Sequence, residues 1–295
     1  MANAIGYVTS GDYATFGTQF ETGVNGSGGG WTVGANVSVK HEEAKGDYDG
    51  KNVRQVLSKL VAKLSNDPDV KLIVAVGGLV SAFAAAKHST KPFLVIVGQI
   101  PAVDDFDLDP DVSFNFCGGI NLDTPATNAA RIADIRPTGA QTQDVFLAFN
   151  NNARMGKAEQ RAFKAIGGSS IAICGVGDND VSDFDNGFKK AKKKGAKALV
   201  VSADPFFAHN RSDLVKAANA ASVSLPVCYP SVFYKQGTGT DNPVAGRDKY
   251  RGPDLQAVYT QLGDKAGKLL TKLTSGAMLP EFMGLDTAAT SIGNF

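Results

Sequence analysis

The sequence lacks the features that mark several large classes of protein. Lys and Arg total 30 against 29 Asp and Glu, which leaves a formal net charge of +1. Proteins that bind nucleic acid or anionic membrane surfaces usually carry a basic excess, so this balance argues against both kinds of partner. The chain also has no apolar run of roughly 18 residues or more, and the sequence therefore predicts no membrane span.

Signatures of catalysis and of cofactor or metal binding are missing as well. The sequence contains no GxxxxGK[ST], HExxH or GxSxG pattern. The glycine-rich stretch at 25–30 does not fit GxGxxG, because Trp31 stands where the last glycine would be. The three histidines are scattered, and none has a Cys or His partner at metal-ligand spacing. We therefore expect no enzyme activity, no cofactor and no metal site.

Cysteine is scarce in this chain. Cys117, Cys174 and Cys228 are odd in number, lie far apart, and stand in or beside apolar runs typical of strands. We interpret them as reduced core residues. A disulfide pair or a reactive thiol is the alternative.

The most informative segment that is present is 69–98, DVKLIVAVGGLVSAFAAAKHSTKPFLVIVG. It reads as a buried strand, a Gly-Gly turn, an alanine-rich helix and a second buried strand. Short runs rich in Val and Ile are typical of parallel strands that are covered on both faces. The carboxyl ends of such strands are where doubly wound sheets bind ligands.

A second copy of this pattern follows in the other half of the chain. AKALVVSAD at 196–204 and LPVCY at 225–229 again read as buried strands. The first strands of the two halves, at 4–10 and 144–150, are offset by about 140 residues. The sequence therefore predicts an α/β protein of two doubly wound, parallel-sheet lobes joined by a multi-strand hinge.

Periodicity and turn residues predict most of the other elements. The lysine-rich end of one helix, at 189–194, reads as a solvated helix terminus rather than an anion site. The polar, glycine-rich segment 236–252 reads as a functional or mobile loop. The expected strands are 33–41, an edge strand at 112–116, and 170–174; the expected helices are 13–24, one ending before 67–69, 154–166, 183–194, 207–221 and 254–273.

Polar and aromatic residues follow the strands of the second half. Asp204 comes directly after a buried strand, where a carboxylate can receive a ligand ammonium, and Phe206 could stack on an apolar or aromatic ligand. The alternative is that Asp204 caps the next helix, and both roles could hold together. Asn150, Asn151 and Asn152 follow the first strand of this half as ligand-orienting candidates. After the last strand, Tyr229 and Tyr234 could gate the cleft or pack the hinge.

The first half has matching candidates. Gly77 and Gly78 end a buried strand, and the backbone N–H groups at the start of the next helix (Leu79 onward), with the Ser81 hydroxyl, suit an anion such as a carboxylate. Plain turn chemistry is the alternative. Further ligand-orienting candidates at strand ends are Ser10, Asp12, Tyr13 and Gln99.

Taken with these sites, the chain resembles the substrate-binding proteins of ABC importers, which have the type I periplasmic-binding-protein fold. It is most similar to the group that includes binders of tryptophan and related amino acids. The resemblance covers nearly the whole chain and rests on AIGYVTSGDYATF, DPDVKLIVAVGGLVSAFAAA, NLDTPATNAARIADI, FNNNARMGKAEQRAFKAIG, KALVVSADPFF, AANAASVSLPVCYP and GLDTAATSIG in this order.

The resemblance implies that 78–81 and 10–13 contact the ligand from lobe one, and that 150–152 and Asp204 do so from lobe two, with Asp204 facing an amine. The loop at 236–252 departs from the tighter return to lobe one that is usual in the family.

We expect lobe one to comprise 1–120 plus 236–279, and lobe two 121–235 plus 280–295, with crossings near 119–123, 230–234 and 279–285. The predicted function is non-catalytic capture of a small polar molecule, amino-acid-like or an aromatic acid, in the inter-lobe cleft by hinge closure, for delivery to an ABC permease. The alternative is a cytoplasmic ligand sensor or a self-assembling structural protein on the same fold.

Two expectations about location conflict. The resemblance implies a periplasmic protein. No signal peptide is recognisable, because the first strand starts at Ala4, so the chain as it stands would be cytoplasmic or a mature form with an added Met1.

Overall fold

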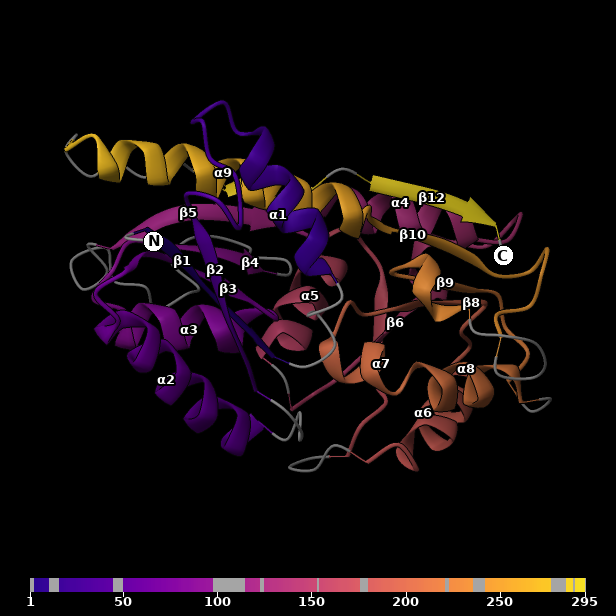
Figure 1. Cartoon of the computed structure of the whole chain (residues 1–295). Coiled ribbons are helices and arrows are strands. Elements are labelled where there is room, and N and C mark those ends of the chain that lie inside the picture. Colours follow the sequence, from indigo (N-terminus) through magenta and orange to yellow (C-terminus); the bar gives the residue numbers. More distant parts are fainter. Residues whose placement is uncertain are drawn as a thin grey trace. The chain divides into compact units, whose positions relative to one another are not determined.

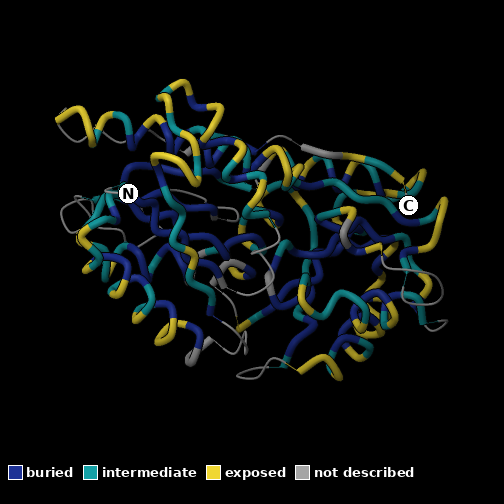
Figure 2. The backbone as a smooth tube through the Cα atoms, viewed as in Figure 1, coloured by how far each residue is buried: buried dark blue, intermediate teal, exposed yellow. Residues whose placement is uncertain are grey.

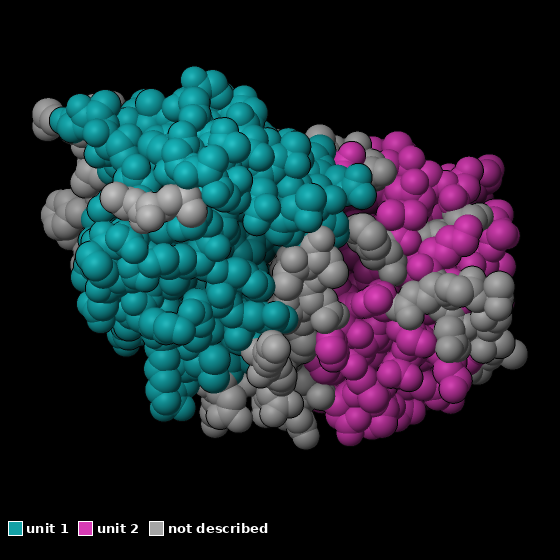
Figure 3. Space-filling model, in the orientation of Figure 1, with its two compact units in different colours: residues 1–122, 255–289 teal, residues 123–254, 290–295 magenta. Residues whose placement is uncertain are grey.

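The structure is a computed structural model that describes residues 3–10, 16–44, 50–97, 115–122, 125–152, 154–175, 180–220, 223–235, 242–276, 285–288 and 290–294. The chain forms two compact units (Figure 3). Unit 1 comprises Met1–Leu122 and Leu255–Ala289, and unit 2 comprises Asp123–Asp254 and Thr290–Phe295. The chain therefore passes between the units three times.

Unit 1 is built on a sheet in which every strand runs parallel to its neighbours. In spatial order its strands are β11 (Leu285–Thr287), β5 (Phe116–Asn121), β4 (Phe93–Val97), β3 (Val70–Val76), β1 (Ala4–Ser10) and β2 (Ser38–Ala44). Strands β3 and β4 are short and largely apolar, as expected when helices cover both faces, whereas the edge strand β2 is polar.

Alternate residues of these strands enter two separate cores of unit 1, because successive side chains of a strand point to opposite faces. Helices α1 (Gly17–Gly26) and α9 (Leu255–Thr274) cover one face, where Ile5 and Tyr7 of β1 are buried. Helices α2 (Gly50–Asn66) and α3 (Leu79–His88) cover the other, where Ala4 and Val8 are buried. Figure 1 shows the helix pairs, and Figure 2 shows the central strands between them as mostly buried.

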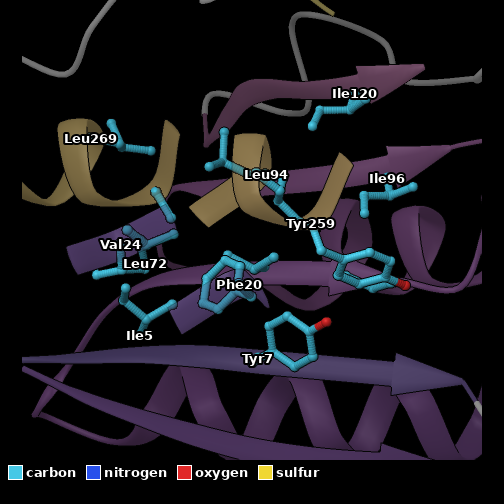
Figure 4. Close-up of a cluster of buried hydrophobic side chains, with 14 of the residues drawn as sticks. Ile5, Tyr7, Phe20, Val24, Leu72, Leu94, Ile96, Ile120, Tyr259 and Leu269 are labelled. Atoms are coloured by element: carbon cyan, nitrogen blue, oxygen red, sulfur yellow. The ribbon is translucent and has the colours of Figure 1, made fainter. Parts of the chain in front are cut away.

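Helices α1 and α9 approach each other at the backbone. A Cβ atom built on Gly23 would lie 2.0 Å from the carbonyl oxygen of Thr260, and one built on Gly263 would lie 2.0 Å from that of Phe20. Only glycine fits this contact. Beneath it, the rings of Phe20 and Tyr7 are 4.9 Å apart, and Figure 4 shows them among the aliphatic side chains of the sheet.

Unit 2 repeats this plan with a different last strand. Helices α4 (Pro125–Ile135) and α5 (Arg154–Ala165) pack together, as do α6 (Asp183–Lys193) and α8 (Arg211–Asn219), with the short α7 (Pro205–His209) beside α8. The strand order is β12 (Thr290–Asn294), β10 (Lys249–Pro253), β9 (Val227–Tyr229), β8 (Ala198–Val201), β6 (Val145–Phe149) and β7 (Ser169–Ala172). All neighbours are parallel except β12, which is antiparallel to β10.

The two sheets have equivalent strand orders, which confirms the predicted pair of similar α/β lobes with parallel-dominated sheets. The three cysteines are free and buried, as expected. Burial raises the thiol pKa of Cys117 to about 11 and that of Cys228 to about 12, so both stay protonated at neutral pH.

Several predicted elements are corrected by strand pairing in unit 1. The strand expected at 33–41 begins only at Ser38, because its register is set by the pairing of Ala4 with Ser38 and of Ser10 with Ala44. The edge strand expected at 112–116 is replaced by β5, an interior strand with β11 on its outer side. Residues 112–114 lie outside the described part of the chain.

Other corrections concern unit 2. The single helix expected at 207–221 is two helices, α7 and α8, which meet at Asn210. The segment 236–252 is not entirely loop, because β10 occupies its end; residues 236–241 are outside the described part.

The division into units also differs from the expected one. Since β10 pairs with β9, the chain stays in unit 2 until Asp254 instead of leaving near 230–234. Since β11 pairs with β5, it stays in unit 1 until Ala289 instead of leaving near 279–285.

Among the described residues, no helix combines the length and the apolar character that crossing a membrane requires.

Candidate functional site

Asp204 lies at the carboxyl end of β8, in the short connection to α7. It is buried, with 2% of its surface exposed. Its Oδ1 accepts a hydrogen bond of 2.8 Å from the Phe206 N–H, which makes Asp204 the N-cap of α7. The capping role is therefore confirmed. Within the described residues, its Oδ2 is buried and has no hydrogen-bond partner of good geometry.

Burial raises the pKa of Asp204 to about 6, because a low-dielectric surrounding disfavours the carboxylate. The Phe206 N–H, the Asn150 side chain and the Phe207 N–H oppose this and lower the pKa. Burial also raises the pKa of the Cys174 thiol to about 12, with a contribution from the negative charges of Asp204 and Asp183. Near neutral pH Asp204 is therefore mostly ionised although it is buried.

The three asparagines after β6 have different surroundings. Asn150 is buried, and its Oδ1 accepts a hydrogen bond of 2.9 Å from the Asn152 N–H. The Asn152 side chain donates to the Gly175 carbonyl at 2.8 Å, while Asp183 Oδ2 accepts from the Gly175 N–H at 2.6 Å. Asn152 thus joins the ends of β6 and β7. Asn151 is half-buried. A ligand contact by these residues stays a prediction.

The aromatic candidates pack inside unit 2. The ring of Phe206 is 5.8 Å from that of Phe184, and both pack with Phe207. Tyr229 is fully buried with its ring 5.0 Å from that of Tyr234, and burial, assisted by the negative charge of Asp248, holds its pKa well above the ordinary value. These contacts fit packing within the unit, and stacking on a ligand stays a prediction.

In unit 1 the turn after β3 has the backbone form that glycine allows. Gly77 and Gly78 have φ values of 113° and 82°, and α3 begins directly after them. Ser81, in the first turn of α3, is buried, and its hydroxyl has no hydrogen-bond partner among the described residues. A buried hydroxyl without a partner is costly, which fits the prediction of a polar ligand at this turn.

The other candidates of unit 1 are less defined. Leu79 is the first residue of α3, and Ser10 is the last residue of β1; their backbones are described but their side chains are not. Asp12, Tyr13 and Gln99 lie outside the described residues.

The structure adds a buried polar network that sequence reasoning missed. Arg131 of α4 and Glu159 of α5 are fully buried, with Nη1 and Oε1 3.4 Å apart. Glu159 Oε2 accepts a hydrogen bond of 2.5 Å from the Ser202 hydroxyl, two residues before Asp204. A usable signal was present: Glu159 shares a helix face with Phe163 at spacing i, i+4, so a charged residue stands on an apolar face.

No protein-family model matches this sequence, and no curated protein matches it either. Solved structures match it in three dimensions. The ABC domain in complex with L-Trp from Streptococcus pneumonia is 12% identical, with a TM-score of 0.68 over 98% of this chain and 91% of that one. A substrate-binding protein with adhesive properties from Clostridium difficile is 16% identical, with a TM-score of 0.63 over 98% and 91%. The chain has the type I periplasmic-binding-protein fold.

The same fold also occurs in gene regulation. A LacI family transcriptional regulator from Bifidobacterium animalis is 13% identical, with a TM-score of 0.58 over 99% of this chain and 96% of that one.

In a type I periplasmic-binding-protein fold, Asp204 and Gly78 occupy equivalent places, since β8 and β3 are equivalent strands of the two sheets. Among the described residues, no three His, Cys, Asp or Glu side chains come together as a metal site.

Proposed function

We propose that this protein reversibly captures a small polar molecule, amino-acid-like or an aromatic acid, between its two units and releases it unchanged to an ABC importer. The observation that carries the proposal is Asp204, a buried carboxylate whose Oδ2 has no hydrogen-bond partner of good geometry among the described residues, at the carboxyl end of a parallel strand. Ligands of open α/β sheets bind at this edge. The fold, shared with an L-Trp complex and a substrate-binding protein, supports the same function.

The chemistry of Asp204 favours an amine. Burial disfavours the anion of Asp204 more than its hydrogen bonds stabilise it, so its pKa is raised to about 6. A ligand ammonium would supply the missing donor and the opposite charge. Amine binding should therefore weaken as the pH falls below about 6, since protonation of Asp204 removes the charge.

The first turn of α3 supplies complementary chemistry in unit 1. Backbone N–H groups at a helix start favour an anion, and the buried Ser81 hydroxyl can donate a further hydrogen bond. An amino acid carries both groups that these positions favour, a carboxylate for the turn at Ser81 and an amine for Asp204. Hinge closure would remove both groups from water and strengthen their interactions.

The proposal is tested by a thermal-shift screen of amino acids, aromatic acids, sugars and nucleosides. A ligand at a hundred times its dissociation constant stabilises the folded state by about 2.7 kcal/mol, which is an easily measured shift. We expect amine-bearing acids to stabilise the protein at pH 8 more than at pH 5. Asp204→Asn should abolish the shift, whereas Asp213→Asn, at an exposed acidic residue of α8, should leave it unchanged. Flat curves for ligand-free protein across the screen would contradict solute capture.

A ligand sensor is the second candidate, because the fold is shared with a LacI family regulator. A sensor would bind its ligand through the same strand ends but pass the signal to a partner other than a permease. Localisation of the untagged native protein separates the two: recovery from the periplasm supports transport, and recovery from the cytoplasm supports the sensor. Flat binding curves would instead favour a self-assembling structural protein.

A further inference from the structure

Unit 2 buries an ion pair that has no obvious value for stability. The side chains of Arg131 and Glu159 are 0% and 1% exposed, and their closest charged atoms are 3.4 Å apart. The cost of removing two such charges from water can exceed their mutual attraction, and apolar side chains of similar size are often as stabilising as a buried ion pair. Their positions in the fold suggest another role.

Glu159 holds the segment that leads into Asp204. Its Oε2 accepts hydrogen bonds from the Ser202 hydroxyl at 2.5 Å and from the Ala203 N–H at 3.3 Å. Asp204 follows directly, and its Oδ1 in turn accepts from the Phe206 N–H. The direction in which the chain leaves β8 is thus fixed by a side chain of α5.

Arg131 connects the same pair to the elements at which the chain enters and leaves unit 2. Its Nε donates to the Arg251 carbonyl of β10 at 2.8 Å. The Arg251 side chain pairs with Asp134 of α4, with Nη2 and Oδ1 3.1 Å apart. Helix α4 follows the first crossing, β10 precedes the second, and β12, which pairs with β10, follows the third.

We infer that Arg131 and Glu159 are positioning residues that couple the Asp204 segment to the crossing elements α4 and β10. A displacement of Asp204 acts on Glu159 through Ser202 and Ala203, and Glu159 acts on β10 through Arg131. The coupling is reciprocal, so a change at β10 also shifts Asp204. The use of this coupling in ligand capture rests on the proposed function; the coupling itself concerns the ligand-free protein.

Hydrogen exchange of the ligand-free protein tests the coupling against a purely structural role. The double variant Arg131→Met and Glu159→Leu leaves neither charge unpaired and should therefore remain folded. Its thermal unfolding midpoint should fall, because the Arg251 carbonyl, the Ser202 hydroxyl and the Ala203 N–H lose their hydrogen-bond partners. The Phe206 amide, which contacts neither substituted side chain directly, should nevertheless exchange at least tenfold faster. Amides of β6, such as Leu147, should be unaffected.

Two further variants keep the test decisive. Glu159→Gln preserves the side-chain shape and should accelerate Phe206 and the β10 amides together, which covers the case in which the double variant does not fold. Lys265→Met removes the cation of an ion pair in unit 1 and should leave Phe206 unchanged. Exchange of Phe206 within twofold of the original in both Glu159 variants, or an equal acceleration throughout unit 2, would overturn the inference.

The outcome is independent of the proposed function. If Phe206 responds as expected but no compound of the screen binds the original protein, solute capture fails and the coupling stands. If amino acids bind and Phe206 does not respond, capture stands and the coupling fails.

Discussion

The two units share a strand order but differ in what their interiors contain. In unit 1 the one buried charged side chain among the described residues is Lys265, and its partner Asp286 is 44% exposed. In unit 2 four are buried: Arg131, Glu159, Asp204 and Asp248. Unit 1 is held by apolar packing and by a backbone contact between two helices, whereas unit 2 is also organised by charges.

The difference between the units reflects two kinds of interaction, apolar packing and buried charge, within the same strand order. Apolar packing is non-directional and gives a stable frame, while buried charges and their hydrogen bonds fix particular atoms in place. Asp248 illustrates the second: its carboxylate accepts from the Val227 and Val244 N–H groups and from Arg247, and so ties β9 to the chain before β10. Most of the buried charged side chains, whose hydrogen bonds depend on orientation, therefore lie in unit 2.

The largest expected effect comes from breaking the buried ion pair of unit 2. Arg131→Met leaves the buried Glu159 carboxylate without its cation, and we expect a loss of about 3–5 kcal/mol in the free energy of unfolding. Lys265→Met in unit 1 should cost about 1 kcal/mol or less, because water can solvate the exposed Asp286. Urea unfolding followed by circular dichroism measures both. Equal losses would show that the units do not differ in this respect.

The backbone contact of unit 1 should respond nearly as strongly to an added methyl group. Gly263→Ala places a Cβ 2.0 Å from the Phe20 carbonyl oxygen, so α1 and α9 must separate. We expect a loss of about 3 kcal/mol, the upper end of typical overpacking costs. The control is Gly26→Ala, where a Cβ meets nothing within 4 Å. This change should leave stability unchanged or raise it by up to about 0.5 kcal/mol; an equal loss would contradict the close approach.

Asp204 should make the stability of unit 2 depend on pH. Its pKa rises from 3.8 in the unfolded chain to about 6 in the folded one because of burial. Between these values the folded state holds more protons, so its stability falls as the pH rises through the window, by at most about 3 kcal/mol. Asp204→Asn should match the original protein at pH 4 and exceed it at pH 8. Urea unfolding of the ligand-free protein at both pH values measures this, and identical pH dependence would refute the assignment.

The smallest effect is expected at exposed ion pairs, and it should be the same in both units. Lys189 pairs with Asp185 on α6 of unit 2, and Lys268 pairs with Asp264 on α9 of unit 1, both at spacing i, i+4. Each Lys→Ala change should cost about 0.5 kcal/mol or less, and high salt should reduce the cost. A larger loss in unit 2 would show that its exposed charges also contribute more to stability than those of unit 1. Burial would then not be the source of the difference between the units.

The apolar runs of the sequence were sufficient to predict most of the sheets. β3, β4, β6 and β8 are short and largely apolar segments, and such runs are typical of parallel strands. β10, β11 and β12 were missed. Lys249–Pro253 is polar and half-buried, so its strand character comes from pairing with β9 and β12 rather than from its own composition.

The candidate site likewise contains residues that the sequence predicted and residues that it did not. Asp204 was predicted from its place after a buried strand, and its capping role from its residue type. Arg131, Glu159 and Ser202 come from three separate elements, and no local pattern joins α4, α5 and the end of β8.

The sequence by itself determined the α/β class, the two-fold repetition and the strand ends that carry polar residues, because these follow from local periodicity and from the chemistry of turns. The tertiary structure decided where the chain crosses between units, which strands close each sheet, and which charges are buried together. These depend on contacts between residues far apart in the chain, such as Arg131 with Arg251, whose energies no short segment of sequence contains.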